Sequence, residues 1–175
     1  ELYSYLRDKK INTGFVATGQ VGITVTGNGI PLDAYKLDHA CGAVETAVVE
    51  QKDKDIIIVE GQGSILHPGS TATLPLMRGT CPTHMILCHI ARNTSIRSLE
   101  KIKIPDLKKF IELNENLASV IGTYPKAKVV GVALNTNLMS QEDAESYIEI
   151  VKKETGIPAT DVIRFGGDRI FSQLL

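Results

Sequence analysis

A carboxylate, an amide, a hydroxyl and an imidazole follow one short aliphatic run of the sequence. Glu60 comes directly after residues 56–59, and Gln62, Ser64 and His67 follow within seven residues. Four consecutive aliphatic residues predict a strand buried on both faces. In an open parallel sheet, ligands bind just beyond the carboxyl ends of the strands. We therefore expect Glu60 to be the functional centre.

Each of these side chains has a chemical role and a plainer alternative. The carboxylate of Glu60 is a hard oxygen ligand that suits Mg²⁺, unless it is only a solvated residue in a glycine-rich turn. His67 precedes a proline in a loop, where it can serve as a general acid or base near neutral pH or contact an anionic substrate. A histidine in such a loop can also be inert. Gln62 and Ser64 are expected to orient substrate oxygens.

The segment 13–22 superficially resembles a phosphate-binding loop. Gly14 and Gly19 have the spacing of that motif, but Gln20 and Val21 replace its lysine and hydroxyl residue. We also expect the segment to lie across a strand, not between a strand and a helix. It is therefore not interpreted as a Walker A motif.

Polar residues near this segment add to the expected site. Thr18 and Gln20 should reach it as groups at a strand end. Asp33 and Asp38 bracket the start of a predicted helix, where carboxylates cap the helix or favour its dipole. Asp33 can equally be a second carboxylate beside Glu60 that binds metal or a substrate amine, whereas Asp38 fits capping better.

Two further groups of side chains are possible ligand-binding residues. The spacing of four possible zinc ligands, Cys81, His84, Cys88 and His89, does not match a familiar zinc site. Alternation along the predicted strand also places the side chains of Cys88 and His89 on opposite faces of the sheet. His89 alone is a candidate for lining a pocket. The segment 135–137 (Asn-Thr-Asn) ends another strand; its first amide can pair with a nucleotide base, or the segment is an ordinary turn.

Strand-like and helix-like segments alternate along the chain, which predicts an α/β fold. Strands are expected at 14–18, 23–26, 56–59, 85–88, 128–134 and 162–165, and helices at 1–10, 37–51, 105–121 and 140–154.

Length, net charge and cysteine content narrow the classes of function that fit the chain. The 175 residues suit one domain over 1–175, and a net charge of -1 does not indicate nucleic-acid binding. Three cysteines and the lack of a membrane span or signal segment favour a soluble, cytoplasmic enzyme domain with a small-molecule substrate. The first residues read as the back half of a helix, so we expect a fragment of a longer protein.

Three motifs together resemble a known family. They are Phe-Val-Ala-Thr-Gly-Gln (15–20), Val-Glu-Gly-Gln-Gly-Ser-Ile-Leu-His-Pro (59–68) and Gly-Val-Ala-Leu-Asn-Thr (131–136). The chain resembles the carboxy-terminal domain of a bacterial and archaeal family of proteins like D-glutamate N-acetyltransferase. More distantly, it is similar to dethiobiotin synthetase and its P-loop relatives. In those enzymes the strand-end glutamate helps to bind magnesium, and the late asparagine contacts the base.

The resemblance implies a fold and a set of roles. The fold is a three-layer, mostly parallel sheet of the P-loop NTPase type that lacks its first strand and Walker A loop, because both would lie upstream of Glu1. Glu60 would bind Mg²⁺, and Asn135 and Thr136 would bind the nucleotide.

The leading functional hypothesis is N-acyl transfer to an amino acid such as D-glutamate. Glu60 and Asp33 would bind metal or position the amine, and His67 would deprotonate it. Gln62, Ser64 and Gln20 would orient the carboxylate or the developing oxyanion. The alternatives are a ligase that uses ATP and Mg²⁺ to activate a carboxylate, and a nucleotide-binding regulatory module without turnover. The expected cofactors are Mg²⁺ and ATP or acetyl-CoA, and we expect a homo-oligomer.

Overall fold

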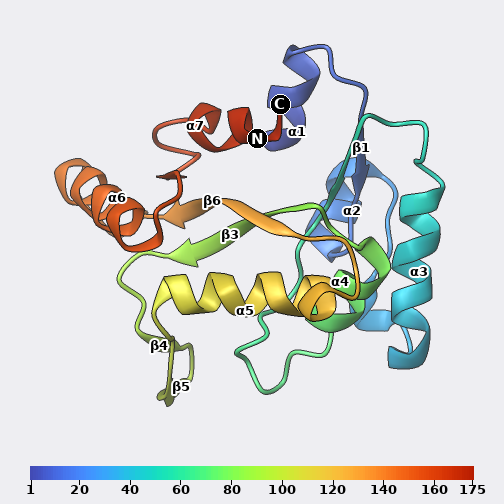
Figure 1. Ribbon diagram of the computed structural model, residues 1–175, viewed down its shortest axis with the longest axis horizontal. Coiled ribbons are helices and arrows are strands. Elements are labelled where there is room, and N and C mark those ends of the chain that lie inside the picture. The colour runs from blue at the N-terminus through green and yellow to red at the C-terminus, as the bar shows by residue number, and fades with distance from the viewer. The chain divides into compact units, whose positions relative to one another are not determined.

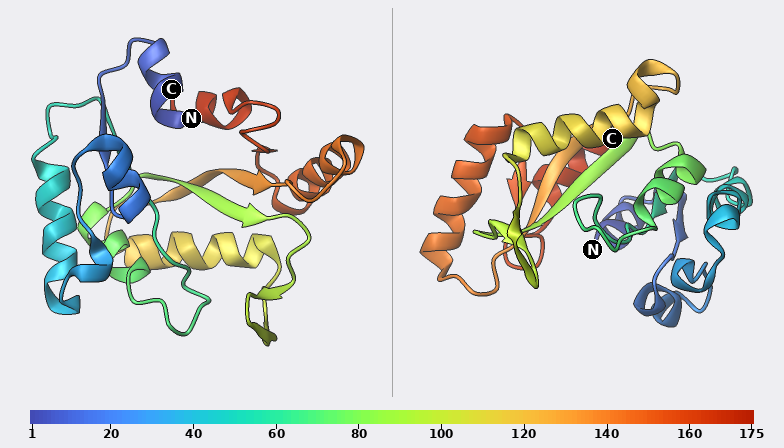
Figure 2. Two further views of the ribbon diagram at one scale, coloured as in Figure 1. Left: turned by 180° about the vertical axis from the view of Figure 1, so that it is seen from behind. Right: turned by 90° about the horizontal axis from the view of Figure 1, so that it is seen from below.

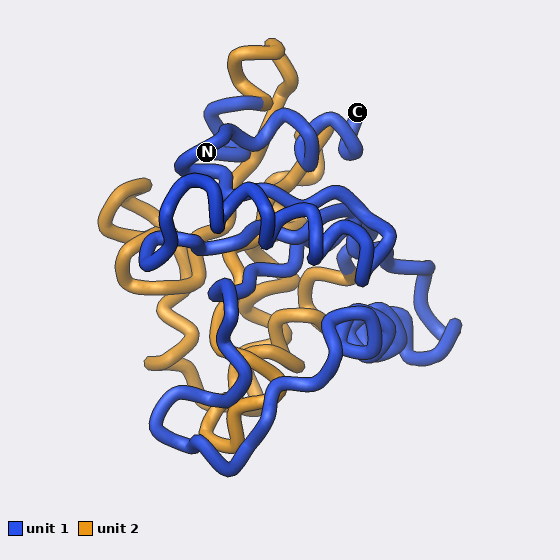
Figure 3. The backbone as a smooth tube through the Cα atoms, turned by 90° about the vertical axis from the view of Figure 1, so that its left-hand side faces the viewer, with its two compact units in different colours: residues 1–5, 82–175 blue, residues 6–81 orange.

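The computed structural model describes residues 1–175, which form two compact units (Figure 3). Unit 1 comprises residues 1–5 and 82–175, and unit 2 comprises residues 6–81. Each unit has its own parallel β-sheet and its own apolar core. The α/β class and the predominance of parallel pairing are thereby confirmed. No helix is both long and apolar enough to cross a membrane.

Unit 2 is built on two parallel strands, β1 (Thr13–Val16, labelled in Figure 1) and β2 (Ile56–Val59), which pair in register from end to end. Between and after them lie the helices α2 (Gln20–Thr26), α3 (Leu37–Val49) and α4 (Thr73–Thr80) and a 3-10 turn at Leu32–Ala34. The core joins both strands to α3 and α4 through Val16, Val44 and Leu76. The helix α1 (Leu2–Asp8) contains the boundary between the units.

Two expectations for unit 2 need correction. The predicted strand at 23–26 is wrong, because these residues belong to helix α2. Their β-branched side chains favour a strand only weakly. The hydroxyls of Thr24 and Thr26 donate to carbonyls one turn back, and Gly27 (φ 74°) ends the helix in the left-handed region. Strand β2 is half-buried along its whole length, not fully buried as expected.

Unit 1 contains a three-stranded parallel sheet in the order β3 (His84–Ile90), β6 (Lys128–Asn135), β7 (Ala159–Thr160). A short antiparallel hairpin, β4 (Ser95–Ile96) and β5 (Leu99–Lys103), follows β3. The helices are α5 (Leu107–Ser119), α6 (Gln141–Thr155) and α7 (Asp168–Phe171), with 3-10 turns at Val120–Gly122 and Ser172–Leu174. Helix α5 runs alongside β3 and β6 in all views (Figures 1 and 2) and supplies Leu107 and Ile111 to the core.

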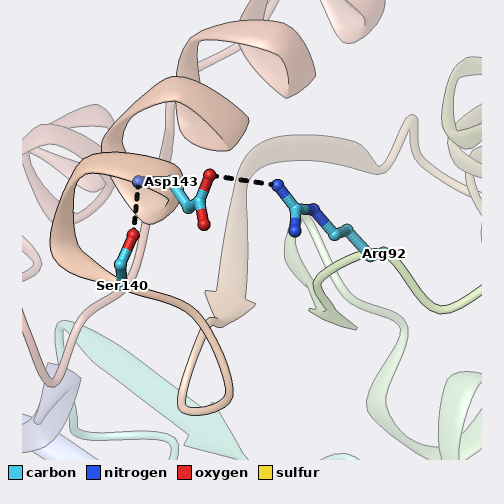
Figure 4. Close-up of polar contacts among 3 residues, drawn as sticks. All are labelled: Arg92, Ser140 and Asp143. Atoms are coloured by element: carbon cyan, nitrogen blue, oxygen red, sulfur yellow. Dashed lines mark hydrogen bonds and ion pairs between the residues drawn. The ribbon is translucent and has the colours of Figure 1, made fainter.

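Helix α6 begins at a side-chain cap, Ser140. The Oγ of Ser140 accepts a hydrogen bond from the main-chain N–H of Asp143 at 3.1 Å. The carboxylate of Asp143 does not return to the cap but pairs with Arg92 at 3.3 Å (Figure 4). Both side chains are exposed, so this ion pair orients the loop after β3 and stabilises the fold little.

Further corrections concern the ends of elements in unit 1. The predicted strand at 162–165 is wrong: strand β7 ends at Thr160, and the following main chain turns. Helix α5 begins after Asp106, whose side chain caps it, so Pro105 precedes the helix and does not lie in its first turn. Ile121 is outside the helix, exposed and at φ 53°.

Candidate active site

The carboxyl ends of β1 and β2 meet at Glu60, as expected for neighbouring parallel strands. One carboxylate oxygen of Glu60, Oε2, accepts hydrogen bonds from the main-chain N–H groups of Thr18 (2.9 Å) and Gly19 (3.0 Å). The fully buried hydroxyl of Thr18 donates to the main-chain oxygen of Glu60 at 2.8 Å. These bonds hold the Glu60 side chain against the turn after β1 and leave Oε1 for a ligand.

Two glycines make room for this arrangement. A Cβ atom on Gly22 would lie 2.3 Å from Oε2 of Glu60, and one on Gly19 would lie 2.0 Å from Nε2 of Gln62. The side chains of Glu60 and Gln62 therefore both lie against the beginning of α2. The structure thus brings Thr18, Glu60 and Gln62 into one cluster.

The turn before α2 has the order of a phosphate loop but not its chemistry. Residues 13–22 run from strand β1 through a turn into helix α2, so the expectation that they lie across a strand is wrong. A phosphate loop binds anions with free main-chain N–H groups and a lysine. Here Glu60 already occupies the N–H groups of Thr18 and Gly19, and Gln20 and Val21 stand in place of the lysine and hydroxyl residue. This turn does not fit a phosphate.

A second polar pair lies at the start of the same helix. The amide nitrogen of Gln20 lies 3.3 and 3.4 Å from the two carboxylate oxygens of Asp33, and both side chains are exposed. No group of three or more His, Cys, Asp or Glu side chains forms a metal cluster in the chain. Magnesium commonly uses only one or two protein carboxylates and completes its shell with water and phosphate. Oε1 of Glu60 and the Asp33 carboxylate have the right chemistry for that limited role.

The loop between Glu60 and α4 is held by its own hydroxyl groups. The Oγ of Ser70 accepts from the main-chain N–H of Ser64 at 3.2 Å and lies 3.3 Å from the Oγ1 of Thr73. Thr73 in turn donates to the main-chain oxygen of Gln62 at 3.3 Å. Ser64 therefore serves this loop as a structural residue, through its N–H and through its Oγ, which accepts from Leu66 N–H at 3.3 Å.

His67 lies exposed in this loop with one ring nitrogen engaged. Its Nδ1 accepts a hydrogen bond from the main-chain N–H of Gly69 at 3.0 Å. The contacts that place Glu60 and Gln62 do not include His67.

Asn135 and Thr136 lie in unit 1, at the carboxyl end of β6. The exposed Asn135 uses its side-chain oxygen to accept from the N–H of Asn137 at 3.1 Å, which leaves its amide nitrogen free to donate. Thr136 is 1% exposed, and its N–H and its hydroxyl both donate to Oδ2 of Asp161. A buried Thr136 can position Asn135 but offers no group of its own to a ligand.

Asp161 belongs to this group as well, although its role was not predicted from the sequence. It is 4% exposed, and its Oδ1 accepts from the N–H groups of Ile163 and Arg164. Burial alone raises its pKa, but the hydrogen bonds from Thr136, Arg164 and Ile163 outweigh burial and lower it below the ordinary value. No local pattern in the sequence signals this role, because it depends on hydrogen bonds from Thr136, twenty-five residues earlier.

His89, which was expected to line a pocket, lies half-buried on β3. Burial lowers its pKa, and the nearby Glu154 acts in the opposite direction. A histidine in this setting is predominantly neutral near pH 7.

Two curated proteins are similar to nearly the whole of this chain. Over 170 residues, the chain is 34% identical to a D-glutamate N-acetyltransferase of Tritonibacter scottomollicae and 33% identical to one of a Pseudoalteromonas species. Each comparison covers 97% of this chain, but only 50% and 51% of the relatives, so the chain spans about half of their length.

A solved structure gives the same result. The crystal structure of a DUF1611 family protein from Anabaena variabilis superposes with a TM-score of 0.96 at 44% identity, over 98% of this chain and 50% of that one. Residues 1–171 match the family DUF1611, described as a domain of unknown function (DUF1611_C) and a P-loop domain. The chain therefore belongs to the DUF1611 family and represents its P-loop domain.

Proposed function

We propose that the protein carrying this chain transfers an acyl group to the amine of a small amino acid such as D-glutamate. Two curated relatives bear the name D-glutamate N-acetyltransferase and match nearly the whole chain. The observation that carries the proposal is the cluster of Thr18, Glu60 and Gln62 at the carboxyl edge of β1 and β2. That edge is where parallel sheets bind small molecules.

The reaction needs a neutral amine and a polarised thioester. The amine nitrogen attacks the thioester carbonyl carbon, a C–N bond forms, the C–S bond breaks, and the thiolate leaves with the proton that the amine loses. In the proposed scheme, Oε1 of Glu60 and the carboxylate of Asp33 hold the substrate amine or Mg²⁺. The amides of Gln62 and Gln20 donate to the substrate carboxylate or to the developing oxyanion, and Ser64 keeps the loop in place.

Three residues, Glu60, Asp33 and His67, have the chemistry of a proton acceptor. Oε1 of Glu60 and the carboxylate of Asp33, which also accepts from the Gln20 amide, carry lone pairs that can take up a proton. His67 is the base expected from the sequence, and that role stays a prediction. A general base must have a free lone pair that faces its substrate. The Nδ1 of His67 does not meet this condition, because its lone pair already accepts a hydrogen bond from Gly69.

The test is a product assay with the intact protein. Acetyl-CoA and D-glutamate should give free CoA and N-acetyl-D-glutamate, detected by thiol release and mass spectrometry. L-glutamate is the stereochemical control, and Glu60→Gln is the matched variant that keeps the shape of the side chain and removes its charge. A Glu60→Gln protein with full activity at saturating Mg²⁺ would remove Glu60 from the mechanism.

The family's P-loop description favours a second candidate, ATP-dependent activation of a carboxylate. In that scheme Glu60 and Asp33 would hold Mg²⁺, and the exposed amide of Gln20 would contribute to the nucleotide site. Release of ADP that depends on a carboxylate substrate, without consumption of acetyl-CoA, would support this candidate. Nucleotide binding with no turnover of either cofactor would support a regulatory module.

A further inference from the structure

The loop that carries His67 is preorganised by short-range hydrogen bonds. The N–H of His67 donates to the main-chain oxygen of Ser64 at 3.0 Å, and its own main-chain oxygen accepts from Ser70 N–H at 2.9 Å. The hydroxyl bonds among Ser64, Ser70 and Thr73 close the loop on itself. The backbone of His67 is thus fixed from both sides, and its ring is presented in one orientation.

The ring nitrogens of His67 have different and complementary roles. Because Nδ1 accepts the N–H of Gly69 at 3.0 Å, the lone pair of Nδ1 is in use. A neutral imidazole carries one hydrogen, which must then be on Nε2. Nδ1 can take up a proton only if the hydrogen bond to Gly69 breaks. In this conformation His67 is a hydrogen-bond donor with no free lone pair.

We propose that His67 binds an oxygen atom of the substrate through Nε2–H, as a donor and not as the general base. This inference rests on the proposed function, because it assigns His67 to the same substrate. Between Glu60 and Arg78 the sequence contains no other ionisable side chain, so no cation in this loop competes for the acceptor. Two acceptors fit this donor: a carboxylate of the amino acid and the carbonyl oxygen of the thioester. Both are oxygen atoms that accept a hydrogen bond from an N–H group.

The first test is the tautomer of His67 and needs no turnover. In ¹⁵N-labelled intact protein, the ring nitrogens can be observed by NMR through the ring C–H groups and assigned with a His67→Gln variant. We expect Nδ1 without a hydrogen and Nε2 with one near pH 7. Titration with D-glutamate alone should move the Nε2 signal if the acceptor is the carboxylate, and titration with acetyl-CoA alone should move it if the acceptor is the thioester. An Nδ1–H tautomer, or an Nε2 signal that neither ligand moves, overturns the proposal.

The second test is a matched pair of variants. The amide nitrogen of Gln reaches the position of Nε2, whereas that of Asn reaches only the position of Nδ1. Loss of a donor to a reacting oxyanion costs about 10²–10³-fold in kcat, so we expect that loss in His67→Asn and near-normal kcat in His67→Gln. A carboxylate acceptor would show the same contrast in KM for D-glutamate. Equal loss in both variants, together with loss of the acidic limb of the pH–rate profile, where the rate falls as a base becomes protonated, would restore His67 as the base.

The two tests separate this proposal from the proposed function. Absence of N-acetyl-D-glutamate from the wild-type assay would reject the acyltransfer function, while the tautomer and the ligand-induced shift of Nε2 would still decide the role of His67.

Discussion

Glu60 combines a structural role with the proposed chemical one. Its Oε2 accepts two main-chain N–H groups of the turn after β1, so a variant that removes the carboxylate leaves both donors unsatisfied. We expect Glu60→Ala to lower the free energy of unfolding by about 1–3 kcal/mol, and Glu60→Gln by less, because the Gln side chain retains one acceptor oxygen. Urea denaturation measures both. Glu45→Ala, an exposed carboxylate on α3, is the control and should change stability by no more than about 0.5 kcal/mol.

Asp161 makes the stability of unit 1 depend on pH. Its folded-state pKa is lower than the ordinary value of 3.8, so the unfolded chain binds the proton more readily than the folded protein. The stabilisation is complete above pH 3.8 and is lost as the pH falls through the folded-state pKa. Asp161→Asn should therefore destabilise the protein by about 1–3 kcal/mol near pH 7, and the gap to the wild type should narrow below pH 3.8.

The measurement for Asp161 is urea unfolding of both proteins at a series of pH values. Glu112→Gln, an exposed carboxylate on α5, serves as the control and should track the wild type throughout. A gap of constant size from pH 7 to pH 2 would show that the hydrogen bonds of Asp161 do not depend on its charge.

At the scale of elements, two helical glycines should respond in opposite directions to the same substitution. Nothing lies within 4 Å of a Cβ on Gly42 in α3, so Gly42→Ala should stabilise the protein by up to about 1 kcal/mol. A Cβ on Gly22 in α2 would lie 2.3 Å from the held carboxylate of Glu60, so Gly22→Ala should destabilise it despite the better helix propensity. Thermal unfolding of the two variants gives the comparison. Stabilisation by Gly22→Ala would mean that Glu60 is not held against α2.

The elements predicted correctly are those in which the periodicity of the apolar side chains and the residues at the two ends indicate the same limits. Helix α6 has a periodic apolar face, Ser140 at its start and Gly156 at its end, and its predicted limits are close to the observed ones. Strand β6 was likewise predicted almost residue for residue. Helix α2 was missed because its side chains prefer strands, and it forms because the chain must cross over between two parallel strands.

The site could be predicted from the sequence where its residues follow the end of a predicted strand. Glu60 was identified because it follows a strand, and the same argument placed Thr18 and Gln62 near it. Asp161 was missed because its role depends on Thr136, twenty-five residues earlier, and no local pattern reveals such a bond. The Nδ1 bond of His67 was equally invisible, since it depends on the conformation of the loop.

At the scale of the whole molecule, the two units have separate cores, and stability should reflect this separation. Leu76 belongs to the core of unit 2 and Ile148 to that of unit 1, and both are buried. Replacing either by alanine should cost about 2–5 kcal/mol. Because local opening follows cooperative units, we expect Leu76→Ala to lower amide protection mainly in β1 and β2.

By the same reasoning, Ile148→Ala should lower protection mainly in β3 and β6. Hydrogen exchange read by mass spectrometry on peptides from each unit makes the comparison. Leu138→Ala is the control, because Leu138 is 91% exposed and should leave both units unchanged. If either core variant lowers protection equally in the strands of both units, the protein unfolds as one cooperative body.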